Sequence, residues 1–444
     1  MRAGSLCVAA VTWGVAWSSA QAHPIDTLAP GHWYEVPGSH LEPLFPSPRP
    51  AGNSGPEAVV NAWGGGGFDG VHERLFLWGG GHGDYGGNEI YAFDVETMKW
   101  SRPWGPEPVV TQIPAQCSSS YAGGTPSARH TYDGIEFIPS TGKMWATGGF
   151  RFCGNASTDN VTWLFDFGSL TWTQGANTLE AVGTPTSAWD PKGQRVLYQA
   201  QNLFQAYDPV TDRYSKLGEV DGGFWSTAVS AVDVAHDLFL SVANGKLRVW
   251  NLATRTFTSE QPTTGGGQAL AGQPGVEWDP QLGRIVTWSG GTSVWSLDVA
   301  SWTWFEHPAA ATNLGTPPPP VPAGTFGRFR YMPARNAYVL VNKTSDNVYF
   351  YKLTSGGGVP VPSPPNRADA GAAAVGAVDS GGADSPSGAG SPGGGSSGGG
   401  SGCSCGIAGR PAGGLAFALF VALGLTICAG RSALGPRSRG RRKR

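Results

Sequence analysis

The chain has 444 residues, with 68 glycines, 35 prolines and only 14% charged residues, so turns are frequent and charge is sparse. Between His23 and Gly402 it holds 21 basic and 32 acidic residues, a net charge of −11. An acidic region repels phosphate backbones, which excludes nucleic acid as an expected partner. The length suits two or three average domains or one large repeat domain.

The first 22 residues are organised like a signal peptide. Arg2 precedes an apolar run over residues 6–17, and the small-residue site Ala20-Gln21-Ala22 follows. These three parts in this order predict export, with cleavage before His23. We therefore expect residues 1–22 to be absent from the mature protein.

Six copies of one pattern follow. A complete copy has two apolar strands, a third strand ending in a marker pair, and an aromatic fourth strand. The marker pairs are Phe93-Asp94, Phe165-Asp166, Tyr207-Asp208, Trp250-Asn251 and Leu297-Asp298, and the sixth copy has none. Four short strands in about 40–50 residues are typical of one propeller blade, so we expect an all-β, six-bladed β-propeller. Residues 103–127 lack the two apolar runs that a seventh blade needs.

The sixth copy stops after three strands, because Tyr349–Leu353 runs directly into a Gly/Pro-rich segment. A strand of the missing type occurs at the start of the mature chain, in HWYEVPGS at 32–39. We therefore predict that this N-terminal strand is the outer strand of the last blade. A ring closed in this way leaves no exposed sheet edge.

Glycine pairs and aromatic residues at fixed places carry a family resemblance. Gly79-Gly80, Tyr91 and Trp100 in the first copy resemble a kelch repeat, as do the corresponding residues of the second and fifth copies. Residues 23–353 thus resemble the kelch-type, galactose-oxidase-like propellers. Oxidase activity in that family needs copper held by two His and two Tyr, with a Cys cross-linked to one Tyr. That set cannot be assembled here, so we predict no cofactor and no catalytic residue.

In a propeller, the loops between second and third strands share one face with the connections between blades. On this loop-rich face we expect residues 79–88, 103–127 and 150–160, together with the starts of the inner strands. Polar groups that converge with aromatic rings suit a sugar or a peptide. The predicted ligand-binding residues are Trp63, His82, Asp84, Tyr85, Arg129, His130, Tyr132, Trp225 and Arg328, and Asn61, Tyr121 and Arg330 occupy similar positions.

Other interpretations of these residues stay open. His82 and Asp84 can simply hold loop backbone, and with His130 they offer at most a sparse metal set, so no metal is predicted. The favoured function is a binding module for an extracellular glycan or protein. An extracellular carbohydrate-active enzyme using His82, Asp84 and His130 is the alternative, and a structural surface protein is the third. A metal, or carboxylates facing each other across the mouth, would favour the enzyme.

Cys117 and Cys153 are the only cysteines of the expected globular region. One lies in the connection between the first two blades and the other in the long loop of the second, so both belong to the loop-rich face. Because exported proteins reside in oxidising compartments, we predict a disulfide between them.

Residues 354–444 have the composition of a flexible linker followed by a membrane anchor. Residues 354–402 are almost entirely Gly, Ser, Pro, Ala and Asp, which predicts a disordered linker. Residues 403–444 contain an uncharged stretch at 411–430, long enough for one transmembrane helix, and then a basic tail. Gly402-Cys403 before this stretch resembles the myxobacterial C-terminal sorting signal. The resemblance implies a sorting protease, a lipid on Cys403 and a surface or outer-membrane location, and an ordinary single-pass anchor is the alternative.

Overall fold

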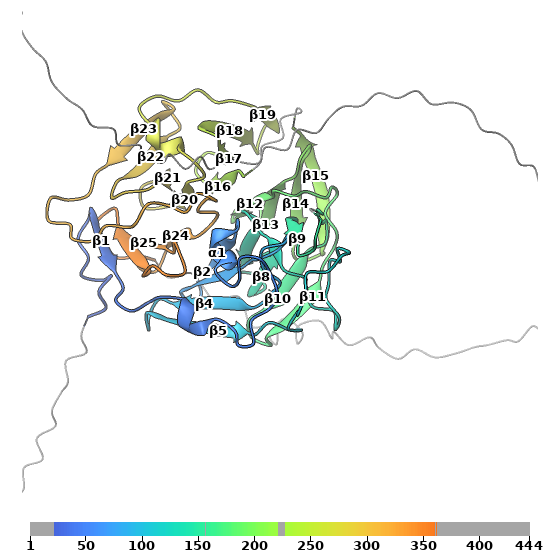
Figure 1. Ribbon diagram of the computed structural model, residues 1–444. Helices are drawn as coiled ribbons and strands as arrows, with labels where there is room; N and C mark the ends of the chain where they lie inside the picture. The colour runs from blue at the N-terminus through green and yellow to red at the C-terminus, as the bar shows by residue number, and fades with distance from the viewer. Residues whose placement is uncertain (1–21, 156, 221–226, 360, 362–444) are drawn as a thin grey trace, which may run out of the picture. The chain divides into compact units, whose positions relative to one another are not determined.

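The computed structural model describes residues 22–155, 157–220, 227–359 and 361, which form six four-stranded antiparallel sheets (Figure 1). The inner strands are β2 (Gly65–Asp69), β7 (Ile135–Ile138), β12 (Thr186–Asp190), β16 (Val229–Asp233), β20 (Gly275–Asp279) and β24 (Phe329–Met332). Each inner strand contacts the inner strands of both neighbouring blades, and β24 contacts β2. The expected all-β, six-bladed propeller is confirmed.

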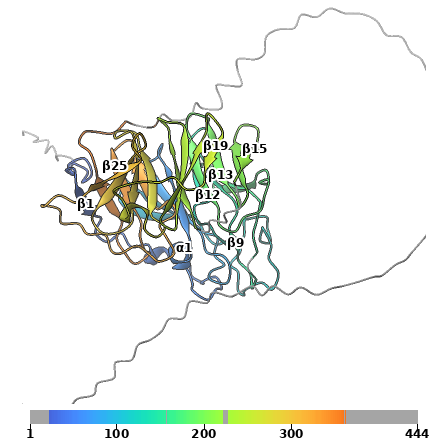
Figure 2. The same ribbon diagram turned by 90° about the horizontal axis from the view of Figure 1, so that it is seen from above.

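The remaining strands continue each blade outward (Figure 2). The second strands are β3 (Arg74–Trp78), β8 (Lys143–Ala146), β13 (Arg195–Gln199), β17 (Leu238–Ala243), β21 (Arg284–Trp288) and β25 (Ala337–Leu340). The third strands are β4 (Ile90–Asp94), β10 (Trp163–Asp166), β14 (Leu203–Asp208), β18 (Lys246–Asn251), β22 (Val294–Asp298) and β26 (Tyr349–Lys352). The fourth strands are β5 (Lys99–Trp104), β11 (Thr171–Gln174), β15 (Arg213–Glu219), β19 (Thr256–Thr258), β23 (Thr303–His307) and, for the sixth blade, β1 (His32–Glu35).

The fourth strand of the sixth blade comes from the start of the described chain. β1 pairs with β26 in antiparallel register, with Trp33 opposite Tyr351. The Trp33 ring is buried and packs on the Tyr351 ring at a centroid distance of 4.6 Å. Two segments far apart in sequence therefore complete one blade.

Aspartates form the tight turns of the blades, which explains the marker pairs of the sequence. Asp94 accepts hydrogen bonds from the backbone N–H and the hydroxyl of Thr97, and Asp166 accepts from the N–H groups of Gly168 and Ser169. Aspartates that end inner strands accept two turn N–H groups in the same way: Asp69, Asp190, Asp233 and Asp279. Because each aspartate bonds to N–H groups only two or three residues away, its position in the sequence marks the turn.

Aromatic residues fill the space between neighbouring blades. Between the first two blades, Phe76 and Trp78 pack with Phe137, Phe167 and Trp172 in one apolar cluster. Full burial of a large apolar side chain contributes about 1.5–3 kcal/mol. These contacts bind adjacent sheets into one ring.

Short elements cover the loop-rich face. They are α1 (Ala58–Asn61), the 3₁₀ turns at Glu42–Leu44 and Gln268–Leu270, and a two-stranded sheet of β6 (Arg129–His130) with β9 (Phe150–Arg151). Within the described ranges, no helix has the length and apolarity needed to cross a membrane. The predicted signal peptide at 1–22 (apart from its last residue), the uncharged stretch at 411–430, Gly402 and Cys403 lie outside those ranges.

Candidate functional site in the central channel

Equivalent positions of the six inner strands line the central channel. The first ring of positions carries glycine or alanine in three blades and a charged residue in the other three: Gly67, Glu136, Ala188, Ala231, Glu277 and Arg330. The next ring is aromatic in five blades: Phe68, Phe137, Trp189, Val232, Trp278 and Tyr331. The small residues leave space that the long charged side chains enter.

A cavity of about 300 Å³ occupies one end of this channel. Apart from Gly67, both rings line it, and so do the first residues after the inner strands: Gly70, Pro139, Pro191, Val234, Pro280 and Pro333. These residues begin the turns between first and second strands. The cavity therefore lies at the face opposite the loop-rich face, where we had not predicted a site.

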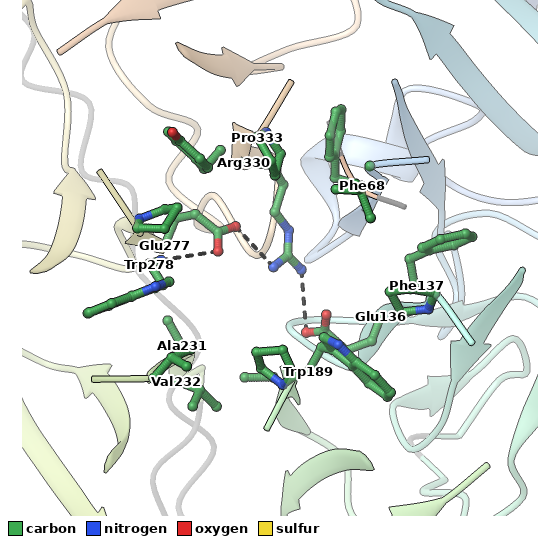
Figure 3. Close-up of a pocket in the computed structure, with 18 of the residues that line it drawn as sticks. Phe68, Glu136, Phe137, Trp189, Ala231, Val232, Glu277, Trp278, Arg330 and Pro333 are labelled. Atoms are coloured by element: carbon green, nitrogen blue, oxygen red, sulfur yellow. Dashed lines mark hydrogen bonds and ion pairs between the residues drawn. The ribbon is translucent and has the colours of Figure 1, made fainter. Parts of the chain in front are cut away.

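Arg330 holds the centre of the cavity between two glutamates (Figure 3). Its Nη2 lies 3.4 Å from an oxygen of Glu136, and its Nη1 lies 3.3 Å from an oxygen of Glu277. The Nε group donates to the carbonyl of Gly327 at 3.0 Å, and Nη2 donates to the carbonyl of Gly66 at 3.2 Å. The guanidinium is thus held in place by both charge and backbone.

Burial raises the pKa of each acid in this cluster. It raises the pKa of Glu136 to about 8 and raises the pKa of Glu277, although the Arg330 charge acts in the opposite direction on both. Asp133 is also buried, and burial raises its pKa to about 7. It accepts hydrogen bonds from the Thr186 hydroxyl and from the N–H of Ser230. We therefore expect Glu136 and Asp133 to gain and lose protons near pH 7–8.

The aromatic residues at the second set of inner-strand positions form apolar walls around the Arg330 cluster. Trp189 and Trp278 are partly buried, while Phe137 and Tyr331 are 4% and 6% exposed. Aromatic walls with a few convergent polar groups are the usual composition of a small-molecule site. The cavity can stack a flat, partly apolar ligand and hydrogen-bond its polar edge.

The loop-rich face brings several of the predicted residues together. His130 Nε2 lies 2.8 Å from an Asp84 oxygen, and the His82 and His130 rings are 5.8 Å apart. The Trp63 ring lies 5.1 Å from His130 and 6.3 Å from Tyr132. The hydrogen bond from His130 lowers the pKa of Asp84, and burial lowers the pKa of His130. The pair is thus a carboxylate accepting from a neutral imidazole.

The other predicted residues have different surroundings. The Tyr85 ring is buried, and its hydroxyl donates to Glu89. Arg129 is buried and pairs with Asp159 at 3.0 Å. Arg328 is buried, with its guanidinium donating to backbone carbonyls such as those of Gly64 and Val341. Trp225 lies outside the described residues.

The predicted disulfide is confirmed, because Cys117 and Cys153 are bonded. It joins the connection between the first two blades to the long loop of the second blade. Among the residues that the structure describes, no three His, Cys, Asp or Glu side chains form a group able to hold a metal ion.

Comparisons with known proteins leave the function open. No protein-family model matches the chain, and no curated protein matches it. It is similar to a structural genomics protein of unknown function from Bacteroides thetaiotaomicron VPI-5482, with a TM-score of 0.44 and 9% sequence identity over 72% of this chain and 75% of that chain. The kelch assignment therefore stays a resemblance, and the six-bladed architecture follows from the six four-stranded sheets described above.

Proposed function

We propose that this protein is a binding module that takes a glycan in the channel cavity. The observation that carries the proposal is the ring of aromatic side chains around the Arg330 cluster. A sugar ring has an apolar face that stacks on indole and phenyl rings, and hydroxyl groups that bond to carboxylate and guanidinium groups. The volume of about 300 Å³ is at the lower end for ligand sites, which suits a chain end or one short glycan segment.

We further propose that the propeller is displayed at the cell surface. Support comes from the leader at 1–22, the linker at 354–402, and the uncharged stretch at 411–430 with its basic tail. Gly402-Cys403 supports processing by a sorting protease, with attachment through a lipid or through the helix. A module on a long linker can reach extracellular glycans without leaving the membrane.

Glycan binding is tested by array screening of the full chain, followed by titration of the best hit. Trp189→Ala and Trp278→Ala are each expected to weaken binding about tenfold, which corresponds to about 1.4 kcal/mol of lost stacking and burial. Trp63→Ala on the loop-rich face is the matched control and is expected to bind normally. Loss of binding in Trp63→Ala alone would place the site with the residues that the sequence predicted. Absence of any array hit would reject the glycan.

An extracellular glycosidase is the second candidate, and one observation favours it. Glu136 and Glu277 face each other across the channel, and both have a raised pKa. Glycosidases use two carboxyl groups, one of them protonated, on either side of the scissile bond. Hydrolysis of an array-positive glycan by the full chain, abolished in Glu277→Gln, would move this candidate ahead of the binding module.

A further inference from the structure

The chain that leaves the sixth blade is tied to the cavity face by side chains of that blade. The Asn336 amide donates to the carbonyls of Ser355 and Gly356, at 3.1 and 3.3 Å. The Lys352 ammonium donates to the Gly356 carbonyl at 2.8 Å. Asn336 and Lys352 are only 2% and 5% exposed, so these bonds are shielded from water. The first residues after β26 are therefore held against the sixth blade by these hydrogen bonds.

The next residues lie against the rim of the cavity. The N–H of Val359 donates to the carbonyl of Pro333 at 2.7 Å, and Pro333 lines the cavity. Gly358 sits so close to this turn that a Cβ on it would lie 2.0 Å from the Pro333 carbonyl oxygen. Only a residue without a side chain fits here, so the contact is a specific one.

Val361 then reaches the cavity itself. It is one of the residues that line the cavity, together with aromatic residues from several blades. Its Cγ2 lies 3.1 Å from the place that a Cβ on Gly70 would occupy, at the first turn of blade one. Val359 thus contacts the sixth blade at Pro333, and Val361 lies beside the first turn of blade one.

We propose that the cavity mouth is a docking groove for a proline-rich strand, and that its occupant is this chain's own segment 359–365, VPVPSPP. Alternating prolines favour the extended polyproline II conformation, which is preformed and loses little entropy on docking. Aromatic-lined grooves are the surfaces that recognise such strands. Trp189 and Trp278 provide the aromatic side chains of the groove. Val359, through its hydrogen bond to Pro333, and Val361, which lines the cavity, fix the first residues of the strand.

Photo-cross-linking in the full chain tests the docking without any glycan. A benzophenone amino acid in place of Ser363 is expected to cross-link to peptides that contain Trp189, Trp278 or Phe68, as identified by mass spectrometry. The same probe in place of Ser380, further along the linker, is expected to give no cross-link to the cavity. Cross-links from position 363 to no cavity peptide, or equal cross-linking from both positions, would overturn the inference.

Two glycine variants separate docking from mere proximity. Gly358→Ala is expected to abolish the cross-link, because its methyl group would collide with backbone at Pro333 and Ala334. Gly357→Ala is the matched control, since nothing lies within 4 Å of its added Cβ. Equal cross-linking in both variants contradicts the inference. These measurements need no glycan, so the two tests can fail independently. A negative glycan screen does not contradict docking of the segment, and a missing cross-link does not contradict glycan binding.

Discussion

Arg330→Met is expected to lower the free energy of unfolding by about 3–5 kcal/mol, the range found when one partner of a buried ion pair is removed. The Arg330 side chain is 10% exposed and faces two glutamates that are 5% and 18% exposed. Without the guanidinium, Glu136 and Glu277 remain near each other with no cation to compensate them. Urea unfolding at pH 8 measures the change, because the glutamates are more ionised there than at acidic pH.

Arg284→Met is the matched control for this loss. Arg284 pairs with Asp298 at 3.6 Å, but both side chains are 30% exposed, so the expected loss is below about 1 kcal/mol. The triple variant Arg330→Met, Glu136→Gln, Glu277→Gln is expected to regain part of the stability, because it removes the uncompensated charges. Equal losses in Arg330→Met and Arg284→Met would show that the central cluster is not a buried electrostatic unit.

Glu136 is expected to make the protein less stable as the pH rises from 5 to 9. Its pKa is about 8 in the folded protein, against an ordinary value of 4.5, because burial disfavours the charged carboxylate. Between these values the folded state binds more protons than the unfolded state, so the free energy of unfolding falls as pH rises. Asp133, with a pKa of about 7, contributes in the same direction. The expected total is on the order of a few kcal/mol.

The Glu136→Gln variant isolates this contribution from other titrating groups. His130 and His307 have lowered pKa values, chiefly from burial, so they make stability rise with pH in the mildly acidic range. Glutamine cannot ionise, so the stability advantage of the wild-type protein over Glu136→Gln is expected to shrink steadily from pH 5 to pH 9. Parallel curves for the two proteins would mean that Glu136 is ionised throughout that range.

The blades were predictable because their signals are local. An aspartate such as Asp166 accepts N–H groups only two and three residues away, so its position in the sequence marks the turn directly. The β1 strand was predictable for another reason, since the sixth repeat visibly lacks a fourth strand. The disulfide followed from the topology, because both cysteines fall on loops of one face.

The cavity was missed because its signal appears only when all six repeats are aligned on their inner strands. Arg330 was noted, but it was assigned to the loop-rich mouth rather than to the opposite end of the channel. Glu136 and Glu277 stand where three other blades have glycine or alanine, and each is followed by an aromatic residue. A charged residue at this position stands out only when the equivalent positions of the other inner strands are known to carry small residues. The approach of Val361 was beyond prediction, because it depends on bonds from Asn336 and Lys352.

The central claim is that ligand binds in the channel cavity, and tryptophan footprinting tests it most directly. The full chain is oxidised with and without the best array-positive glycan, and each tryptophan is quantified by mass spectrometry. Our account predicts that bound glycan protects Trp189 and Trp278 and leaves Trp63, which is 37% exposed on the other face, unprotected. Protection of Trp63 with unchanged oxidation of Trp189 and Trp278 would contradict it.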